Sequence, residues 1–490
     1  MSQRYDLVAI GGGTAGLIAT LGVAGIGGRA ALIEANHLGG DCLWTGCVPS
    51  KALLSAAHAA HLMRNADRYG LPSHEPTVDL AAVMAQVRAA QAVIEPHDSP
   101  ERLRGAGVDV FEDHGRFVGP GQIQVGERTL SYRAAMISTG TRPMLPPIPG
   151  LAELGPLTSD TVWELDTLPS RLVVLGGGPI GCELGQAFAR LGANVTIIEA
   201  ETTLMPREQA SVGEFFAETF RSEGIEVRTG VRAETAEPIT PLAGRDPDRG
   251  AGHPGRLRLA DGSTVEFDRI LVAVGRRPNS GDVGLETVGV ETSERGHVLV
   301  DDRMRTTGDR IFAAGDITGR MPFTHVAAYQ ARLVVTNAMF RTRRRANYDG
   351  IPWATFTDPE MARVGLDGPA ARKRWGAKAT VQRYDYAQLD RAIAHQRARG
   401  WVELVGDPKR RLVGATIVGD AAGEAIAEMV AWVTTGRKID DISTTVHAYP
   451  TFAEGPSRAA DEVLRARFFN PKVLRLTKPL LGLLRRIDHP

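Results

Sequence analysis

Residues 7–16 of the chain read LVAIGGGTAG, and residues 172–181 read LVVLGGGPIG. In each stretch a short apolar run, suited to a buried parallel strand, leads into glycines with the spacing G-x-G-x-x-G. A second apolar run follows, over 30–33 and 195–198, and ends on an acid. The two copies lie 165 residues apart at every matched position. One such glycine pattern is weak evidence, whereas two in register indicate a repeated strand–helix–strand unit.

The repeated glycines predict that the chain binds two dinucleotides. A turn without side chains lets a pyrophosphate approach the helix N-terminus, whose N–H groups and dipole stabilise the anion, while the terminal acid accepts from ribose hydroxyls. The expected cofactor-binding residues are Gly11, Gly13, Gly16 and Glu34 in the first copy, and Gly176, Gly178, Gly181 and Glu199 in the second. Glu199 favours NADH, because a carboxylate repels the 2′-phosphate of NADPH, although the nearby Arg207 weakens that preference.

Composition excludes several classes of protein. Lysine and arginine number 57 in the 490 residues, and aspartate and glutamate also number 57, so no basic field exists to hold nucleic acid. Apolar residues make up 43% and charged residues 23%, a globular balance. Three cysteines cannot form a secreted disulfide framework, and the sequence shows no signal peptide and no membrane-spanning run. We therefore expect a cytoplasmic protein in a reducing compartment.

Two of the three cysteines fall in one glycine-bounded segment, GGDCLWTGCVPSK, at residues 39–51. Pro49 suits the first turn of a helix, which would place Cys47 at a helix N-terminus near Lys51, where a thiol pKa is lowered. The alternative is a pair of buried structural cysteines. A zinc site is disfavoured, because no second pair supplies four ligands, and no metal site is predicted.

This segment resembles the redox-active disulfide of the flavin-dependent pyridine-nucleotide disulfide oxidoreductases, a family that includes dihydrolipoamide dehydrogenase, glutathione reductase and mercuric reductase. Four further stretches are similar to the family: ISTGTRP at 137–143, VAVGRRPN at 272–279, RTTGDRIFAAGD at 305–316 and FTDPEMARVG at 356–365. They resemble the segment that crosses from the flavin domain to the nicotinamide domain, the return segment, the second flavin motif and the start of a dimerisation domain. The likeness extends from about Tyr5 to Arg465.

The resemblance implies an electron path from NAD(P)H through FAD to a Cys42–Cys47 disulfide. Cys47 would be the flavin-proximal thiolate and Cys42 the thiol that attacks the acceptor. Lys51 and Glu183 match a pair beside the flavin, for which an ordinary surface ion pair is the alternative. Further cofactor-binding residues implied by the matching motifs are Thr139, Gly140, Gly275 and Asp316.

The implied fold is α/β, with two Rossmann-like dinucleotide-binding domains for FAD and NAD(P) and an α+β C-terminal dimerisation domain. Residues 1–150 would form the first part of the FAD domain, 151–274 the NAD(P) domain, 275–347 the second part of the FAD domain, 348–465 the dimerisation domain and 466–490 a basic amphipathic tail. Residues 236–255, rich in Pro, Gly and Asp, are expected to form a surface hairpin or insertion. A strand is expected over 411–418 and a helix over 421–433.

Near the C-terminus the chain departs from the commoner pattern of the family. Tyr449 precedes Pro450 where a catalytic histidine is expected, while Glu454 keeps its spacing. A phenol is a poor base at neutral pH, and mercuric reductases resemble this chain in having tyrosine there, beside the second subunit's disulfide. His447, two residues earlier on an extended chain, is either a substitute base or a histidine packed in the dimer interface.

Other features of the sequence are compatible with more than one electron acceptor. The chain lacks the C-terminal cysteine pair of mercuric reductases, Cys182 is expected to be a buried filler, and Trp44 either walls off the disulfide or packs. We expect a homodimeric enzyme with a composite active site that passes electrons to a small molecule or metal ion. The alternatives are a dihydrolipoamide dehydrogenase or low-molecular-weight disulfide reductase, and a low-turnover redox-responsive flavoprotein. The basic, leucine-rich tail could contact a membrane peripherally or dock on the subunit surface.

Overall fold

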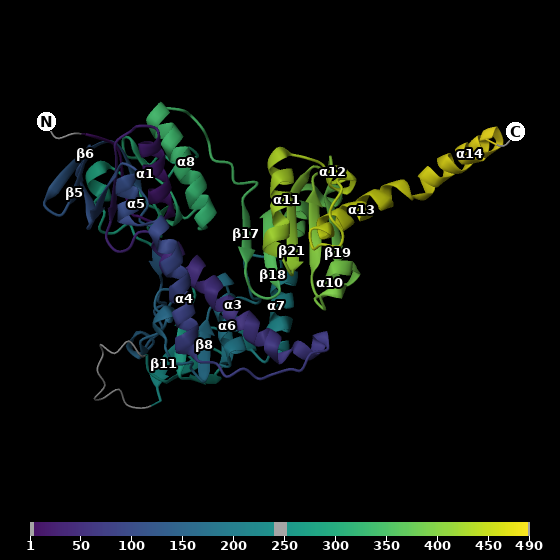
Figure 1. The fold of residues 1–490 in the computed structure, drawn as a ribbon, viewed down its shortest axis with the longest axis horizontal. Helices are drawn as coiled ribbons and strands as arrows, with labels where there is room; N and C mark the ends of the chain where they lie inside the picture. The colour runs from purple at the N-terminus through teal and green to yellow at the C-terminus, as the bar shows by residue number, and fades with distance from the viewer. Residues whose placement is uncertain (1–3, 240–251, 489–490) are drawn as a thin grey trace. The chain divides into compact units, whose positions relative to one another are not determined.

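The computed structural model describes residues 4–239 and 252–488. The chain forms two compact units, one of residues 1–67 and 72–346, the other of residues 68–71 and 347–490 (Figure 1). The first unit contains β1 (Tyr5–Ile10), α1 (Thr14–Gly25), β2 (Ala30–Glu34), α2 (Gly40–Trp44), α3 (Cys47–Arg64), α4 (Leu80–Ile94), α5 (Pro100–Gly105), β3 (Val108–Glu112), β4 (Gly115–Gly119), β5 (Gln122–Val125), β6 (Arg128–Ile137), β7 (Thr141–Pro143), β8 (Arg171–Leu175), α6 (Pro179–Leu191), β9 (Asn194–Glu199), α7 (Ala210–Ser222), β10 (Glu226–Thr229), β11 (Ala233–Pro238), β12 (Gly255–Leu259), β13 (Thr264–Phe267), β14 (Arg269–Val272), β15 (Arg276–Pro278), β16 (Ile311–Ala313) and α8 (Thr324–Phe340).

Two sheets of the first unit carry the sequence repeat. The larger has the strand order β3-β2-β1-β6-β5-β4, with β16 pairing with β6, and the smaller has the order β10-β9-β8-β14. Strands β1 and β2 are parallel, as are β8 and β9, and each pair is connected by one helix, α1 or α6. All four apolar runs of the repeat are strands, so the predicted α/β fold with two Rossmann-like units is confirmed.

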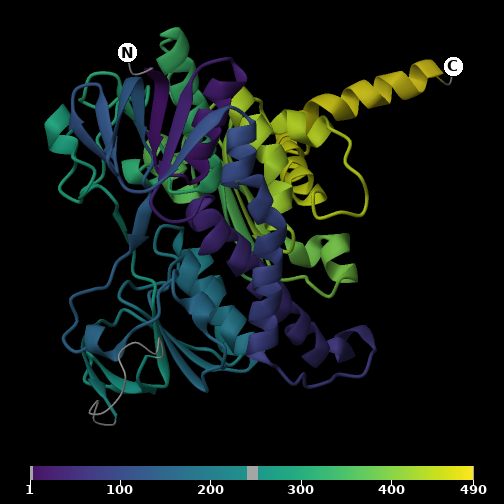
Figure 2. The ribbon, with the colours of Figure 1, turned by 60° about the vertical axis from the view of Figure 1, so that its left-hand side comes forward.

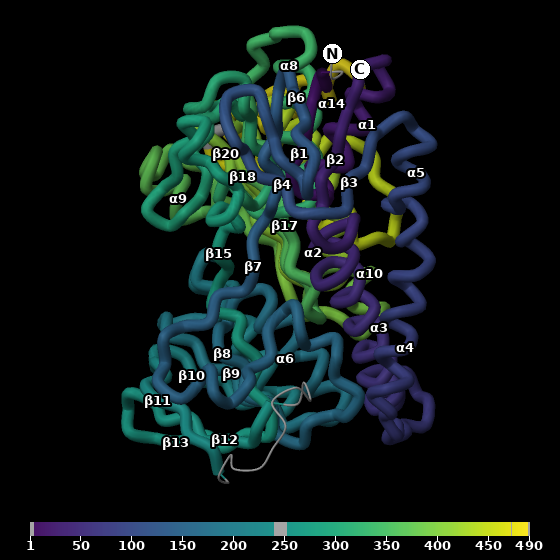
Figure 3. The backbone as a smooth tube through the Cα atoms, turned by 90° about the vertical axis from the view of Figure 1, so that its left-hand side faces the viewer, coloured from purple at the N-terminus to yellow at the C-terminus, as the bar shows by residue number. Residues whose placement is uncertain are grey.

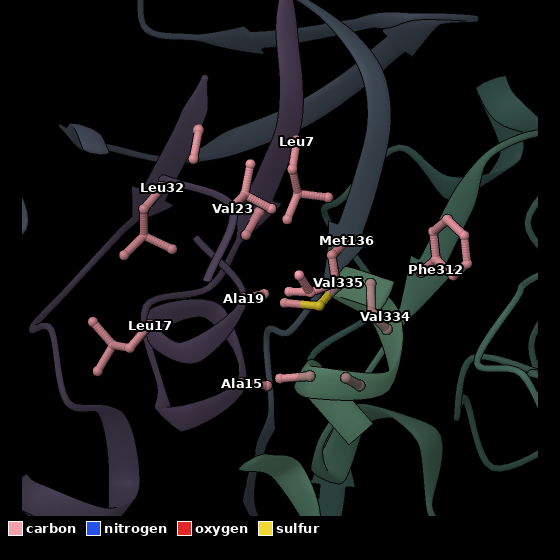
Figure 4. Close-up of a cluster of buried hydrophobic side chains, with 14 of the residues drawn as sticks. Leu7, Ala15, Leu17, Ala19, Val23, Leu32, Met136, Phe312, Val334 and Val335 are labelled. Atoms are coloured by element: carbon pink, nitrogen blue, oxygen red, sulfur yellow. The ribbon is translucent and has the colours of Figure 1, made fainter. Parts of the chain in front are cut away.

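The core of the larger sheet joins segments far apart in the sequence. Leu7 on β1 and Leu32 on β2 are fully buried against α1, and Val334 on α8 belongs to the same cluster as Met136 on β6 (Figure 4). Helices α1 and α8 pack against each other on this face of the sheet. The first glycine motif and helix α8, which follows the motif at 305–316, thus belong to the same core.

The predicted crossing and return segments lie side by side. Strands β7 and β15 form a two-stranded antiparallel ladder in which Thr141 faces Pro278. Strands β11 and β12 are also antiparallel, and their pairing ends with Pro238 opposite Gly255. The ends of the expected 236–255 hairpin are therefore paired, whereas residues 240–251 lie outside the described residues.

The second unit is an antiparallel sheet with helices. It contains β17 (Pro352–Thr355), β18 (Glu360–Gly365), α9 (Gly368–Trp375), β19 (Thr380–Asp385), α10 (Asp390–Ala394), β20 (Trp401–Gly406), β21 (Leu412–Gly419), α11 (Ala422–Thr435), α12 (Ile439–Thr444), α13 (Glu454–Phe468) and α14 (Pro471–Asp488). The strand order is β17-β18-β21-β20-β19. The strand and helix expected at 411–418 and 421–433 are present as β21 and α11, so the predicted α+β layout is confirmed.

Within the described ranges, no helix combines the length and the apolar character needed to cross a bilayer.

The third glycine of each motif is fixed by close approach of the helix to the turn. A Cβ atom on Gly16 would lie 1.9 Å from the carbonyl oxygen of Gly11. We expect Gly16→Ala to lower the free energy of unfolding by about 1–3 kcal/mol, because backbone must move to relieve the overlap. The measurement is the urea midpoint of the purified protein.

Gly25 supplies the matched control in the same helix. Its Cβ would meet nothing within 4 Å. Gly25→Ala should leave the midpoint unchanged or raise it slightly, since alanine is the better helix former. Equal midpoints for the two variants would contradict the close-approach explanation.

Candidate active site

The two thiols are brought together at a junction between two helices. Cys42 lies in α2, and Cys47 is the first residue of α3, with Pro49 in its first turn. At Gly46, between the helices, a Cβ atom would lie 2.8 Å from the carbonyl oxygen of Asp41. The tight junction places the Cys42 thiol within hydrogen-bond reach of Cys47, and no disulfide joins the two thiols.

The two thiols have opposite acidities. The pKa of Cys47 is lowered to about 6, first by the hydrogen bond from Cys42 and then, against the opposing effect of burial, by Thr324 and the charge of Lys51. Thr324 Oγ1 lies 3.3 Å from Cys47 Sγ. The pKa of Cys42 is raised, because this thiol donates to Cys47 and is largely buried. At neutral pH the reduced pair therefore holds a thiolate on Cys47 and a thiol on Cys42.

An ion pair joins the thiol-bearing helix to the helix of the second repeat. Lys51 Nζ on α3 lies 2.9 Å from Glu183 Oε2 on α6. The Glu183 side chain is only 9% exposed, against 38% for Lys51. A carboxylate so deeply buried depends on its cation, so the arrangement argues against an ordinary surface ion pair.

Three side chains hold the segment that carries the two thiols. Gln91 on α4, which packs beside α3 (Figure 3), donates to the carbonyl oxygens of Leu43 and Trp44 at 3.0 and 2.9 Å. Trp163 donates to the carbonyl oxygen of Thr45 at 3.0 Å. The third contact is an ion pair between Arg276 and Asp41, the residue that precedes Cys42.

Sequence reasoning missed these three residues. Arg276 stands directly beside the predicted Gly275, and its guanidinium also donates to Thr141 Oγ1 at 2.7 Å on the crossing strand. Gln91 is a buried polar residue on the apolar face of α4, a pattern that could have marked it as a partner of backbone groups.

Trp44 is anchored by its own hydrogen bond. Its indole Nε1 donates to the carbonyl oxygen of Leu38 at 2.7 Å, and its ring centroid lies 5.2 Å from that of His37. These contacts support the packing interpretation of Trp44. Cys182 is fully buried and burial raises its pKa, which agrees with its expected role as a filler.

The two glycine turns are near copies in three dimensions. Gly11 and Gly176 have φ angles of +105° and +111°. The N–H that follows each donates to the acid of its own repeat, at 2.5 Å to Glu34 and 2.7 Å to Glu199. Each acid thus sits at the end of its strand beside the turn, where a ribose would lie next to a bound pyrophosphate.

The first turn fits a dinucleotide such as FAD. A Cβ atom on Gly11 would lie 2.3 Å from the carbonyl oxygen of Ser138, so this position admits no side chain. At Gly13, the cap of α1, a Cβ would meet only Gly40, at 3.9 Å. The helix N-terminus is therefore open to an anion. In the second turn Gly178 caps α6 in the same way, and a Cβ on Gly181 would lie 1.9 Å from the carbonyl oxygen of Gly176.

The crossing and return segments bring the remaining predicted cofactor residues together. Thr139 Oγ1 donates to the carbonyl oxygen of Asn279 at 2.7 Å, and the Asn279 N–H donates to Gly140 at 3.0 Å. Gly275, with a φ of +143°, lies in the return segment directly before β15.

Asp316 begins the short 3-10 helix Asp316–Thr318, and burial raises its pKa while the charge of Arg276 lowers it. It accepts a long hydrogen bond of 3.4 Å from Thr141 Oγ1. A partly buried carboxylate with so weak a contact suits a further hydroxyl donor, as a flavin side chain would supply.

Tyr449 and Glu454, the site residues predicted near the C-terminus, lie in the second unit and differ in their exposure to solvent. Tyr449 is 65% exposed, and its phenol donates to Asp390 Oδ2 at 2.9 Å, an interaction that raises the tyrosine pKa. Glu454 is buried and accepts from Arg458 at 2.9 Å. The exposed phenol is thus oriented but stays protonated at neutral pH.

His447 is engaged at both ring nitrogens. Nε2 lies 2.9 Å from Glu428 Oε2, and Nδ1 lies 2.9 Å from the carbonyl oxygen of Thr445. The side chain is only 10% exposed. These contacts favour a packed histidine and disfavour a free base.

Family comparison places this site in a known class. Residues 5–331 match the model described as pyridine nucleotide-disulphide oxidoreductase, and residues 351–460 match the dimerisation domain of the same family. The chain belongs to the pyridine nucleotide-disulphide oxidoreductase family. Members use FAD and NAD(P)H, so this chain is an FAD-dependent NAD(P)H oxidoreductase that forms a homodimer, as the sequence predicts.

Relatives in the family act on different acceptors. The chain is 32% identical to a mercuric reductase of Bacillus cereus, over 92% of this chain and 70% of that protein. It is 33% identical to a dihydrolipoyl dehydrogenase of Thermus scotoductus, over 94% and 97% of the two chains. Nearly equal identities leave the acceptor undecided between these two kinds of enzyme.

Solved structures show the same fold. The HOCl-induced flavoprotein disulfide reductase RclA from Escherichia coli, in its Cu(II) complex, has a TM-score of 0.81 at 25% identity, covering 94% of this chain and all of that chain. LpdA from Mycobacterium tuberculosis has a TM-score of 0.83 at 25% identity, with 93% and 99% covered.

The acidity of Cys47 gives a pH-dependent test. In the reduced protein the thiolate should persist above about pH 6 and be lost as the pH falls through that value. The ultraviolet absorbance of the thiolate, followed during acid titration, measures it. Cys42→Ala removes the first cause of the low pKa and should shift the midpoint upward.

Thr324→Val should produce a smaller upward shift, because this hydroxyl is a weaker contributor than Cys42. Cys182→Ala is the control and should leave the titration unchanged, since burial keeps that thiol protonated. A midpoint that stays near the ordinary thiol pKa in the unmodified protein would contradict the assignment.

Proposed function

We propose that the enzyme passes electrons from NAD(P)H through FAD to Cys42 and Cys47 and on to a small thiophilic acceptor, in the manner of a mercuric reductase. The observation that carries this proposal is the pair of unequal thiols, a thiolate at Cys47 and a protonated thiol at Cys42. Two sulfurs within hydrogen-bond reach can close a disulfide when oxidised, and can bind a soft metal ion or attack a disulfide when reduced.

The cofactors are assigned to the two repeats. FAD is held by residues 1–150 and 275–347, with Gly11, Gly13, Gly16 and Glu34 at the pyrophosphate and ribose and Thr139, Gly140 and Asp316 nearby. NAD(P)H is held by residues 151–274, with Gly176, Gly178, Gly181 and Glu199, and with Gly275 at the return segment. Bound FAD supplies hydride acceptance and two-electron transfer to sulfur. The ion pair of Lys51 with the buried Glu183 joins α3 of the first site to α6 of the second.

Glu199 supports NADH as the preferred donor. Both of its oxygens already accept backbone hydrogen bonds, from Gly177 at 2.7 Å and from Glu201 at 2.8 Å. The carboxylate is therefore fixed beside the turn, where it would repel a 2′-phosphate.

The acceptor site is proposed to be composite. Tyr449 and Glu454 of one subunit reach the Cys42–Cys47 pair of the second subunit in the homodimer. Tyr449 is exposed and its phenol is held by Asp390, so it can hydrogen-bond or ligate an acceptor but is a poor proton acceptor. This supports a metal ion over a dithiol. We place the activity in the cytoplasm, where thiols stay reduced.

Dihydrolipoamide dehydrogenase or low-molecular-weight disulfide reductase activity is the second proposal, with His447 as base. The 33% identity to a dihydrolipoyl dehydrogenase supports it. The contacts of His447 to Glu428 and Thr445 weigh against it, because both ring nitrogens are engaged within the second unit.

An acceptor screen separates the two proposals. NADH consumption by the holoenzyme should be faster, as kcat/KM, with mercuric ion than with lipoamide or small disulfides. Cys42→Ser and Cys47→Ser should each lower kcat on the order of a thousandfold or more. Tyr449→Phe should lower kcat/KM for mercuric ion by about tenfold, the cost of one hydrogen bond.

His447→Gln is the control for the second proposal and should leave mercuric ion turnover nearly unchanged. A kcat/KM for lipoamide far above that for mercuric ion, lost in His447→Gln, would reverse the order of the two proposals. Negligible NADH consumption with every acceptor would instead support a low-turnover redox-responsive flavoprotein.

We also propose that the C-terminal tail, residues 466–490, contacts a membrane peripherally. Several of its leucines are exposed, among them Leu476 and Leu480 at 76% and 55%. Co-sedimentation with vesicles should be lost when residues 466–490 are deleted, while NADH turnover is kept. Equal sedimentation with and without the tail would refute this contact.

A further inference from the structure

Helix α14 (Pro471–Asp488) sorts its side chains into two arcs. An α-helix has about 3.6 residues per turn, so residues three or four apart share a side. The apolar arc consists of Val473, Leu474, Leu476, Leu480, Leu481, Leu483, Leu484 and Ile487, with the polar Thr477 and Asp488 among them. The basic arc consists of Arg475, Lys478, Arg485 and Arg486, with Gly482 among them. The helix is therefore apolar along one side and positively charged along the other.

The apolar arc faces solvent. Leu483 and Ile487 are 56% and 62% exposed, and Phe469, just before the helix, is 71% exposed. In Figure 2 the helix, in yellow, extends as a single rod away from the sheet and helices of its own unit. Apolar side chains exposed in a continuous row mark an interaction surface.

We infer that α14 lies in the plane of an anionic lipid surface, with its leucines in the acyl boundary and its basic arc among the phosphate headgroups. This inference rests on the proposed membrane contact of residues 466–490 and names its lipid class and its geometry. A strongly basic polar face opposite an apolar face, in a helix that cannot span a bilayer, is typical of interfacial helices.

The positive charge of α14 favours a lipid surface over a protein as its binding partner. Five lysines and arginines and one aspartate give residues 471–488 a charge of 5 − 1 = +4, although the whole chain is neutral. A second α14 would bring the same positive charge and be repelled. An apolar groove on another protein would use the leucines and leave the basic arc without a role, whereas an anionic membrane uses both.

Pro479 is compatible with this orientation. The helix continues through it. A proline removes the hydrogen bond to the carbonyl four residues earlier, which here belongs to Arg475 on the basic arc. Water among the headgroups can solvate that carbonyl, so the missing hydrogen bond lies on the side of the helix that faces the hydrated headgroups.

Binding through α14 would concentrate the enzyme on an anionic membrane while its thiol site keeps its own chemistry.

The test compares vesicles of phosphatidylcholine alone with vesicles that also contain phosphatidylserine, using the full-length holoenzyme. The unmodified protein should co-sediment with the anionic vesicles and be released by salt. One variant carries four changes on the basic arc: Arg475→Gln, Lys478→Gln, Arg485→Gln and Arg486→Gln. Its partition coefficient for anionic vesicles should fall on the order of a hundredfold or more.

A second variant, Leu476→Gln with Leu480→Gln, should also lose binding, because it removes apolar area and keeps the charge. The matched control removes four arginines from another exposed segment: Arg341→Gln, Arg343→Gln, Arg344→Gln and Arg345→Gln. This control should bind like the unmodified protein. NADH turnover without vesicles, measured on every sample, verifies that each variant is folded.

The outcomes separate this inference from the proposals on which it rests. Binding to neither kind of vesicle would overturn the membrane contact itself. Equal binding to neutral and anionic vesicles, or equal loss in the arginine control, would overturn only the selection of anionic lipid. Neither result would affect the proposed reduction of an acceptor by Cys42 and Cys47, which the turnover assay tests separately.

Discussion

The structure depends on a steric constraint at two turns, where the start of a helix approaches the strand end so closely that no side chain fits between them. At Gly181, as at Gly16, a Cβ atom would overlap the carbonyl oxygen of the first glycine. That approach aims the N–H groups of each helix at the same edge of its sheet. The position of the acids Glu34 and Glu199 follows from it, because each carboxylate is held by the N–H of the turn itself.

The positions of the two thiols depend on these turns. Helix α2 starts beside the first turn, where a Cβ on Gly40 would lie 2.8 Å from Gly13. Helix α3, which packs against α2, also packs against α6, the helix that starts at the second turn. The Lys51–Glu183 pair therefore joins elements positioned by both glycine motifs. Gln91 and Trp163 then hold the backbone between the cysteines, and Arg276 pairs with the Asp41 side chain just before Cys42. These contacts come from three different elements and keep the sulfurs close whether or not a disulfide joins them.

The sequence was sufficient for features that depend on local spacing. The two repeats, the α/β fold, the helix start at Cys47 and the α+β layout of the C-terminal unit all follow from apolar runs, glycines and prolines that lie near one another in the chain. The likeness in sequence also brought Lys51 and Glu183 together correctly, although 132 residues separate them.

Features that depend on long-range contacts could not be derived in this way. The ion pair between Arg276 and Asp41 joins residues 235 apart, and neither residue belongs to a pattern that predicts a partner. The low pKa of Cys47 was expected from the helix N-terminus and Lys51, whereas the hydrogen bond from Cys42 is its first cause. The carboxylate that engages His447 comes from Glu428 on α11, 19 residues earlier in the chain, which spacing alone does not reveal.

The pairing of β16 with β6 sets the order in which the protein can be completed during synthesis. The larger sheet starts at Tyr5 but gains its last strand only at Ile311–Ala313, and its core includes Val334 on α8. The smaller sheet, whose strands all lie between these points, emerges from the ribosome in full while the larger one still lacks a strand and a covering helix. The smaller sheet can therefore fold first, and the larger sheet is completed around its own early strands only after the chain returns at Ile311.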